Sequence, residues 1–166
     1  MNKQEIYNYL NSKNIKYEII NHLPVYNMFD LEKVNLPNKE YDAKNLFIRD
    51  DKKINYYLIT VKGNKKINLK EFRKVNNTRP LTFASDLDLL NILNLKPGSV
   101  TPLGLLNDKK IQVKFYLDDE FDLDSYIYVH PNDNTVTISL KVLDLINIIK
   151  EHGNLTNVIK LWKKIT

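Results

Sequence analysis

Apolar residues recur along the chain at two spacings, one typical of helices and the other of strands. In the segment 2–13, Ile6, Tyr7 and Leu10 lie at helical spacing. The next segment, 16–22 (KYEIINH), is short and rich in residues that favour extended backbone. The pattern predicts a helix followed by a strand.

The segment 45–63 contains two apolar runs, LFI and YYLITV, on either side of the polar sequence DDKK. This arrangement predicts a β-hairpin that ends at Gly63, with both arms buried on both faces. Two helices are predicted next, at 68–75 and 85–94. Each of these segments begins with a residue that can cap free N–H groups and has an acidic residue three positions later.

Strand patterns dominate the following part of the chain. In the segment 111–117 (IQVKFYL), apolar residues alternate with polar ones, which predicts a strand. The runs 125–130 and 135–140 lie on either side of a PNDN turn and predict two further strands. Neighbouring strands that are joined by short turns indicate antiparallel pairing.

Two amphipathic helices are predicted towards the C-terminal end, one at 140–152, which Gly153 ends, and one at 154–165. Helices and strands therefore alternate without the regular repetition of an α/β protein. This order indicates an α+β fold with a mixed, largely antiparallel sheet, and we expect one domain across 1–166.

The charge of the chain is compatible with an anionic partner such as nucleic acid. Lys and Arg number 25 against 20 Asp and Glu, the formal net charge is +5 and the isoelectric point is near 9.2. Nucleotide composition can also produce this excess of Lys together with Asn and Ile. Only three arginines occur, Arg49, Arg73 and Arg79, so a bidentate contact to a phosphate has few candidates.

The composition disfavours several chemistries. The chain has no cysteine, which excludes disulfides, thiolate nucleophiles and cysteine-based zinc sites, and its three histidines, His22, His130 and His152, are scattered. We therefore expect neither a metal nor another cofactor. No segment has the apolar character of a signal peptide or a membrane span, so we expect a soluble cytoplasmic protein without a membrane partner.

Lys44 and Asn45 stand at the start of the first hairpin arm, directly before an apolar run. In a strand, Lys44 shares a face with Leu46 and Ile48, so a charged group borders an apolar interior. One interpretation is a strand-end lysine whose ammonium reaches solvent along its stem. The functional alternative is a lysine at the rim of a binding pocket.

Two further places combine turn chemistry with polar groups. The loop 96–104 (KPGSVTPLG) can present backbone N–H groups to an anion or a developing oxyanion, although it lacks the spacing of a nucleotide P-loop and can equally be a plain connection. His130 ends a predicted strand just before a turn, which suits a functional or a structural histidine. No partner for a Ser-His-Asp triad is evident, so covalent catalysis is not expected.

The segment 61–80 is strongly basic, with seven Lys or Arg among twenty residues around the end of the hairpin and a helix. A solvated surface and a contact to an RNA backbone both explain this composition.

Four segments taken together are similar to the YbaK/ProX family of free-standing aminoacyl-tRNA deacylases. They are DAKNLFIRD, YYLITVKGNKKINLKEF, LTFASDLDLLNILNLKPGSVTPLGL and YVHPNDNTVTISL, which keep the family's order from about residue 16 onwards. The family is related to the editing domain inserted in bacterial prolyl-tRNA synthetases. The resemblance implies a mixed, partly barrel-like sheet surrounded by helices, and metal-independent hydrolysis of mischarged tRNA(Pro), with alanyl-tRNA(Pro) as the substrate of the branch that this chain resembles most.

The resemblance also implies the site residues Lys44, Asn45, Gly98, Ser99 and His130. Lys44 can neutralise a phosphate or orient the end of the substrate. Backbone N–H groups around Gly98 and Ser99 can bind the carbonyl oxygen as it becomes an oxyanion. Asn45 and His130 can hold the substrate or an attacking water.

Selectivity by size follows from the same resemblance, because a pocket that admits alanine can reject the larger proline. The expected wall residues are Met28, Val100, Thr101 and Pro102. Asn27 stands where the family more often has Thr.

The expected partner is the acceptor end of tRNA(Pro), with Arg79, Lys65 and Lys66 as its contacts, and prolyl-tRNA synthetase is a further candidate partner; DNA is not expected. Two alternatives stay open. One is hydrolysis of cysteinyl-tRNA(Pro), and the other is a non-catalytic module of the same fold that senses aminoacyl-tRNA or an amino acid.

Overall fold

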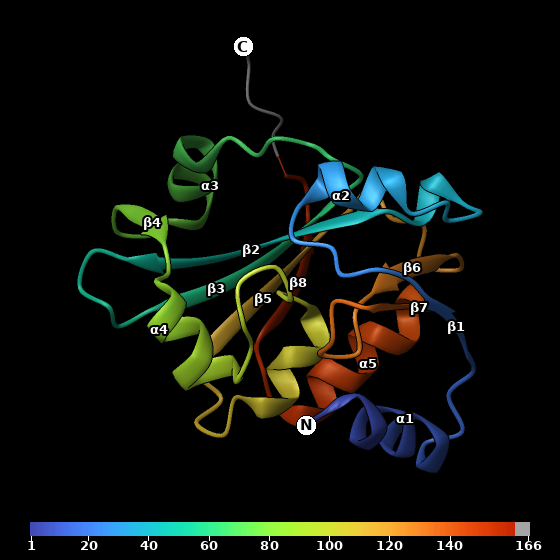
Figure 1. The fold of residues 1–166 in the computed structure, drawn as a ribbon. Helices are drawn as coiled ribbons and strands as arrows, with labels where there is room; N and C mark the ends of the chain where they lie inside the picture. Colours follow the sequence, from blue (N-terminus) through green and yellow to red (C-terminus); the bar gives the residue numbers. More distant parts are fainter. Residues whose placement is uncertain (162–166) are drawn as a thin grey trace.

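The computed structural model describes residues 1–161 and folds them into two β-sheets with helices around them (Figure 1). The five-stranded sheet has the order β4-β2-β3-β5-β8 and the three-stranded sheet the order β1-β7-β6. The strands are β1 (Tyr17–Asn21), β2 (Ala43–Asp50), β3 (Tyr56–Lys62), β4 (Leu81–Phe83), β5 (Val113–Asp118), β6 (Tyr126–Val129), β7 (Val136–Lys141) and β8 (Thr156–Ile159).

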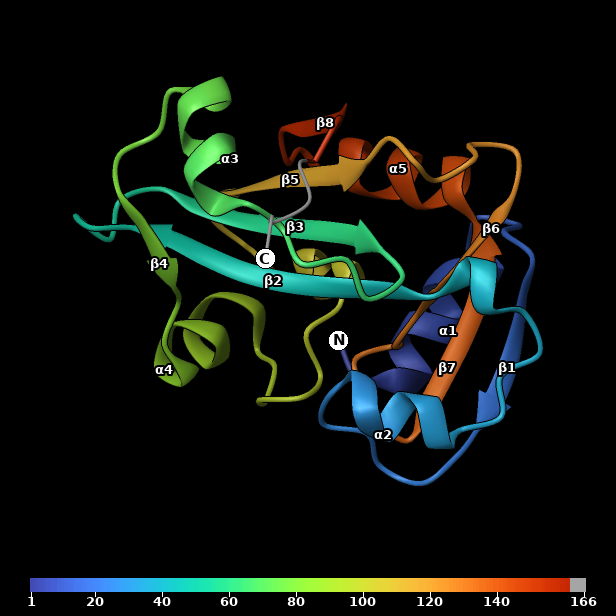
Figure 2. The same ribbon diagram turned by 90° about the horizontal axis from the view of Figure 1, so that it is seen from above.

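Helices lie on both sides of the five-stranded sheet. Figure 2 shows α3 on one side of this sheet and α4 on the other. The α-helices are α1 (Lys3–Ser12), α2 (Met28–Lys33), α3 (Leu69–Asn76), α4 (Asp86–Asp88) and α5 (Val142–His152); η1 (Lys39–Tyr41) and η3 (Pro102–Asn107) are 3₁₀ helices, and η2 (Leu89–Leu93) is a π-helical turn that continues α4.

The strand pairing confirms the predicted mixed, largely antiparallel α+β fold. Of the six pairings among the described residues, β1/β7, β2/β3, β2/β4 and β6/β7 are antiparallel, while β3/β5 and β5/β8 are parallel. The two sheets have free edges and do not close into a barrel.

Two hydrophobic cores hold these layers together. The larger one joins both sheets to α1, α5, η2 and η3, with Leu58, Phe115 and Ile138 fully buried. The smaller one lies under α3 and includes Ile59 and Phe72. Strand β3 lies between the two cores and is buried on both faces, as predicted, but the first four residues of β2 are only half-buried because they border a cavity.

The predicted helix starts follow from side-chain capping. Asn2 and Ser85 each form a capping box with the acidic residue three positions later, and the side chain of Asn68 accepts from the N–H of Glu71. Gly153 ends α5 with a positive φ of 112°, which glycine adopts without steric cost. These short-range signals explain why the helices 2–13, 68–75, 85–94 and 140–152 were predictable.

The predicted helix at 154–165 is wrong. Residues 156–159 form β8, which pairs in parallel with β5; the N–H of Phe115 donates to the carbonyl of Leu155 at 2.8 Å. Without β8, the edge of β5 that faces away from β3 would be unpaired, and pairing that edge outweighs the weak helical periodicity of the segment. The rest of the predicted helix, from residue 162, lies outside the described residues.

Candidate active site

A cavity of about 280 Å³ lies where the start of β2 meets the segment around α2, the loop 96–101 and the end of β6. Strands β2 and β6 come close together at this point (Figure 2). The cavity brings together six of the residues predicted for the site, namely Met28, Lys44, Asn45, Gly98, Val100 and His130. The other residues that line it are Val25, Tyr26, Asn27, Leu31, Ala43 and Leu46.

Lys44 is half-buried at this cavity, and no other described residue forms a hydrogen bond or an ion pair with its ammonium. Burial lowers the pKa of the Lys44 ammonium, and the positive charge of Lys66 lowers it further. An ammonium kept partly out of water without an anion costs free energy. The position of Lys44 therefore suits an anionic group that comes from outside the described chain.

The side-chain amide of Asn45 is held at both ends. The hydroxyl of Thr60, directly across the β2–β3 pair, donates to Oδ1 of Asn45 at 2.6 Å. Nδ2 of Asn45 donates to the carbonyl of Val100 at 3.3 Å. Asn45 thus connects the start of β2 to the loop 96–101 and keeps one orientation at the cavity wall.

His130 is a neutral imidazole with a defined tautomer. Its Nδ1 lies 2.7 Å from the carbonyl oxygen of Val136, which can only accept, so Nδ1 carries the proton. Burial lowers the pKa of His130, which keeps the ring neutral. Nε2, which bonds to no other described residue, then carries a lone pair at a site that can take a proton from water.

This assignment predicts a dependence of stability on pH. Because the folded state lowers the pKa of His130, the unfolded chain binds a proton more readily below the ordinary histidine pKa of about 6.5. We expect the His130 resonance in NMR to titrate with a midpoint below 6.5, and the free energy of unfolding to fall as the pH drops through that range. The His130→Gln variant should lose this part of the pH dependence, and an unchanged dependence would contradict the assignment.

The loop 96–101 requires glycine at position 98. Gly98 has a positive φ of 85°, and a Cβ at this position would lie only 2.9 Å from Cδ1 of Tyr26 and 3.0 Å from its Cα. The N–H of Ser99 donates to the carbonyl of Lys96 at 3.0 Å, so it is already engaged within the loop. The loop therefore meets the cavity through Gly98 and Val100, and not through Ser99.

Three of the predicted site residues, Ser99, Thr101 and Pro102, are buried and do not line the cavity. The hydroxyl of Thr101 points inward, where it donates to the carbonyl of His130 at 2.7 Å and accepts from the N–H of Leu103 at 3.4 Å. Thr101 begins η3 in this way, and its contact supports the backbone of His130 from behind.

The three predicted tRNA contacts lie in different surroundings. Lys66 is exposed and close enough to Lys44 to affect its pKa. Arg79 is exposed and forms a bidentate pair with Asp51 at the far end of the hairpin, about 20 Å along β2 from Lys44 at the usual rise of a strand. Lys65 is only 10% exposed, and its ammonium lies 2.7 Å from a carboxylate oxygen of the fully buried Asp118.

A much smaller cavity of about 30 Å³ adjoins the first and shares Leu31, Ala43, Asn45 and His130 with it. Its further lining residues are Tyr128, Val129 and Thr137. These residues, together with Tyr26, were not predicted from the sequence. Two residues before His130, Tyr128 lies on the same face of the strand, and Thr137 lies on the strand that follows the PNDN turn. Strand alternation could therefore have pointed to both.

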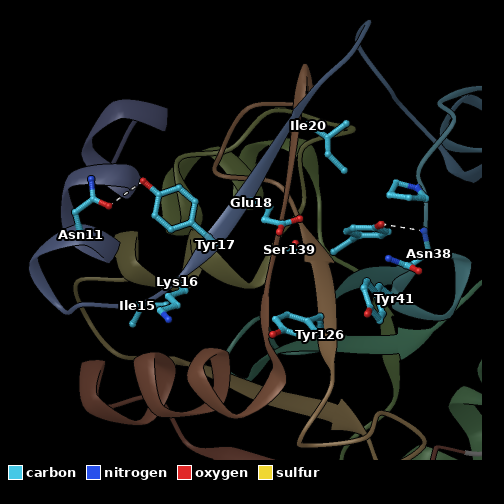
Figure 3. Close-up of a pocket in the computed structure, with 12 residues that line it drawn as sticks. Asn11, Ile15, Lys16, Tyr17, Glu18, Ile20, Asn38, Tyr41, Tyr126 and Ser139 are labelled. Carbon is cyan, nitrogen blue, oxygen red and sulfur yellow. Dashed lines mark hydrogen bonds between the residues drawn. The ribbon is translucent and has the colours of Figure 1, made fainter.

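A separate groove of about 880 Å³ lies on the outer face of the three-stranded sheet (Figure 3). Four tyrosines line it: Tyr17, Tyr41, Tyr126 and Tyr128. Of these, Tyr128 also borders the small cavity. None of the predicted site residues is among the described residues that line this groove.

Within residues 1–161, no three His, Asp or Glu side chains are grouped so that they could hold a metal ion. In the same part of the chain, no helix combines the length and the apolar character needed to cross a membrane.

The model of the aminoacyl-tRNA editing domain family matches residues 22–148. The match contains the whole cavity, from Val25 to His130. The chain belongs to the aminoacyl-tRNA editing domain family. Editing of an aminoacyl-tRNA is hydrolysis of the ester that joins the amino acid to the tRNA, so the enzyme class expected from the sequence, an aminoacyl-tRNA hydrolase, is confirmed.

Two relatives and one solved structure agree with this family. The chain is 38% identical over 159 residues to the prolyl-tRNA editing protein ProX of Acetoanaerobium sticklandii, which covers 96% of this chain and 97% of the relative. It is 33% identical over 144 residues to the prolyl-tRNA synthetase associated domain-containing protein 1 of Mus musculus, which covers 84% of this chain and 85% of the relative. The crystal structure of a candidate trans-editing enzyme for prolyl-tRNA synthetase superposes with a TM-score of 0.74 at 14% identity, covering 98% of this chain and 97% of that structure, and shows that the editing-domain fold is shared.

Proposed function

We propose that this editing-domain protein hydrolyses the ester of alanine attached by mistake to tRNA(Pro). The observation that carries the proposal is the unpaired, half-buried ammonium of Lys44 beside the fixed amide of Asn45 and the neutral ring of His130 at one cavity. The 38% identical relative is named a prolyl-tRNA editing protein, which supports the choice of tRNA(Pro).

In the proposed reaction, water attacks the alanyl carbonyl carbon, the carbonyl oxygen becomes an oxyanion, and the bond to the ribose oxygen breaks to give alanine and free tRNA. Nε2 of His130 accepts the proton of the attacking water and returns it to the ribose oxygen. The amide of Asn45 holds the ester in one orientation. Lys44 binds the neighbouring phosphate or the developing oxyanion as a cation.

The small cavity supports alanine as the preferred amino acid. A single water needs roughly 10–15 Å³ by this measure of volume, so about 30 Å³ is room for a methyl group but not for a pyrrolidine ring. Its lining combines the apolar side chains of Leu31, Ala43 and Val129 with polar ones that include Thr137. A side chain of this size would be accepted while proline is excluded, which is the second sieve of editing.

The test is single-turnover deacylation of alanyl-, cysteinyl- and prolyl-tRNA(Pro) by the wild-type protein. We expect alanyl-tRNA(Pro) to be hydrolysed fastest and prolyl-tRNA(Pro) to stay charged. Faster hydrolysis of cysteinyl-tRNA(Pro) would replace alanine by cysteine in the proposal. Binding without hydrolysis of any of the three would favour a sensing module instead.

The Thr60→Val substitution should lower the rate constant for alanyl-tRNA(Pro) about tenfold. Valine has the shape of threonine but cannot donate to Oδ1 of Asn45, so the amide is free to turn away from the ester. Thr82→Val, on the exposed side of β4, serves as the matched control and should leave the rate unchanged. Equal rates for the Thr60 variant and the wild type would show that Asn45 is not positioned in this way.

We also propose that the acceptor end of tRNA(Pro) approaches across Lys44 and Lys66, and that Arg79, farther along the hairpin and paired with Asp51, contacts the acceptor stem through its remaining donors. Prolyl-tRNA synthetase, which would supply the mischarged substrate, is the proposed source of that tRNA and a candidate for direct association.

A further inference from the structure

Three large apolar side chains are exposed beside the cavity, on the segment that leads into α2 and on the first turn of this helix. They are Leu23, Tyr26 and Phe29, with exposed fractions of 82%, 64% and 65%. We refer to these three residues as the mouth ridge. Neighbouring exposed apolar residues of this size often mark a binding surface, and Tyr26 also lines the cavity that holds Lys44.

The backbone under Tyr26 is held in place from both sides. Its N–H donates to the carboxylate of Asp30 at 3.1 Å. The preceding residue, Val25, exchanges two hydrogen bonds with Asn134, one of 3.1 Å from its N–H and one of 3.0 Å to its carbonyl. The side chain of Tyr26 packs so closely on Gly98 that a Cβ there would collide with the ring. A ligand would therefore meet a ring that is already in position, and little conformational entropy would be lost on binding.

Of the two rings in the mouth ridge, Tyr26 is the one that lines the cavity and has no cation on its face. The ammonium of Lys33 lies 4.4 Å from the centroid of the Phe29 ring and occupies one of its faces. No ring or ammonium of another described residue stacks on Tyr26. An exposed aromatic ring that is fixed at its base and free on one face is the usual platform for an unpaired nucleobase.

We propose that Tyr26 stacks on the base of the last nucleotide of the tRNA. This inference rests on the proposed function, because an ester held at Asn45 and His130 places its ribose at the cavity mouth, one sugar ring away from the base. The cations Lys44 and Lys66 lie at the same mouth and face the phosphate of that nucleotide. Tyr26 thus binds the nucleoside while the inner cavity binds the amino acid.

The experiment uses two RNA minihelices that carry the acceptor stem of tRNA(Pro). Both end in alanine joined to the terminal ribose by an amide, which is not hydrolysed under these conditions, and one of them lacks the terminal base. Dissociation constants are measured for the wild type, Tyr26→Ala, Tyr26→Phe and Phe83→Ala. Phe83, exposed to 60% on β4, is the matched control for the loss of an exposed ring.

We expect Tyr26→Ala to weaken binding of the complete minihelix at least about fivefold. Binding of the minihelix without the terminal base should not change. Tyr26→Phe keeps the ring and should bind like the wild type, as should Phe83→Ala. Equal losses on both minihelices would show that Tyr26 only supports the Gly98 loop and would overturn the proposal, as would a Tyr26→Ala variant that binds the complete minihelix normally. The proposed function is judged separately, because wild-type protein that binds these minihelices but leaves alanyl-tRNA(Pro) charged would contradict hydrolysis alone.

Discussion

Replacing Lys44 with methionine should lower the single-turnover rate constant for alanyl-tRNA(Pro) by about 100-fold or more, and at the same time raise the melting temperature of the protein. The rate falls because the cation that binds the phosphate or the oxyanion is removed. Stability rises because the half-buried ammonium has no anionic partner in the described chain, and methionine keeps the apolar stem without the charge. Rates are measured with excess enzyme and melting by circular dichroism.

The opposite signs of the two effects separate a functional lysine from a structural one. A strand-end lysine that only covers apolar surface would leave the rate unchanged when its stem is kept. Lys66→Met is the matched control, since Lys66 is exposed on the same side of the molecule and should affect mainly the salt-dependent binding of tRNA. A Lys44→Met variant that hydrolyses alanyl-tRNA(Pro) at the wild-type rate would contradict the role of Lys44.

The position of Lys44 and Asn45 was predictable from the sequence because both residues interrupt an apolar strand at its first positions. Strand alternation places them on opposite faces, yet both line the same cavity, because the cavity wraps around the start of β2. His130 was predictable for a similar reason, as the polar residue that directly follows β6 before a turn. Local pattern marks such boundary positions, but it left a structural interpretation of Lys44 and His130 open, and the resemblance to the family selected them as expected site residues.

Local pattern failed where distant contacts decide the structure. The segment at 156–159 became a strand because β5 presents a free edge, and the sequence does not reveal that edge before the sheet order is known. Thr101 is polar, as a site residue would be, but its hydroxyl points inward and donates to the carbonyl of His130. Tyr26 was missed because a lone exposed tyrosine on a loop has no periodic signature, and only its packing against Gly98 gives it a role.

In the basic segment 61–80, the sequence likewise did not reveal which lysines are exposed and which are paired inside the fold. The second large effect that we expect concerns Lys65. Lys65→Met should lower the free energy of unfolding by about 3–5 kcal/mol. The ammonium of Lys65 lies 2.7 Å from Asp118 and 3.4 Å from Glu120, and it donates to the carbonyl of Leu161 at 3.0 Å. Because Asp118 is fully buried, the substitution leaves a carboxylate without its counter-ion. Urea unfolding at neutral pH measures the loss.

Two comparisons decide whether Lys65 stabilises the fold or contacts RNA. Lys66→Met removes the same charge from an exposed neighbour and should change the free energy of unfolding by no more than about 0.5 kcal/mol. Adding Asp118→Asn to Lys65→Met should recover part of the lost stability, because it removes the buried charge and its one amide oxygen still accepts from the N–H of either Lys62 or Glu120, which bond to different oxygens of Asp118. A Lys65→Met variant with wild-type stability and weakened tRNA binding would instead support the contact between Lys65 and tRNA that was predicted from the sequence. A destabilised variant that binds tRNA normally in its folded state would mean that Lys65 anchors the end of β5, and that the RNA-facing charge of this segment lies on Lys66.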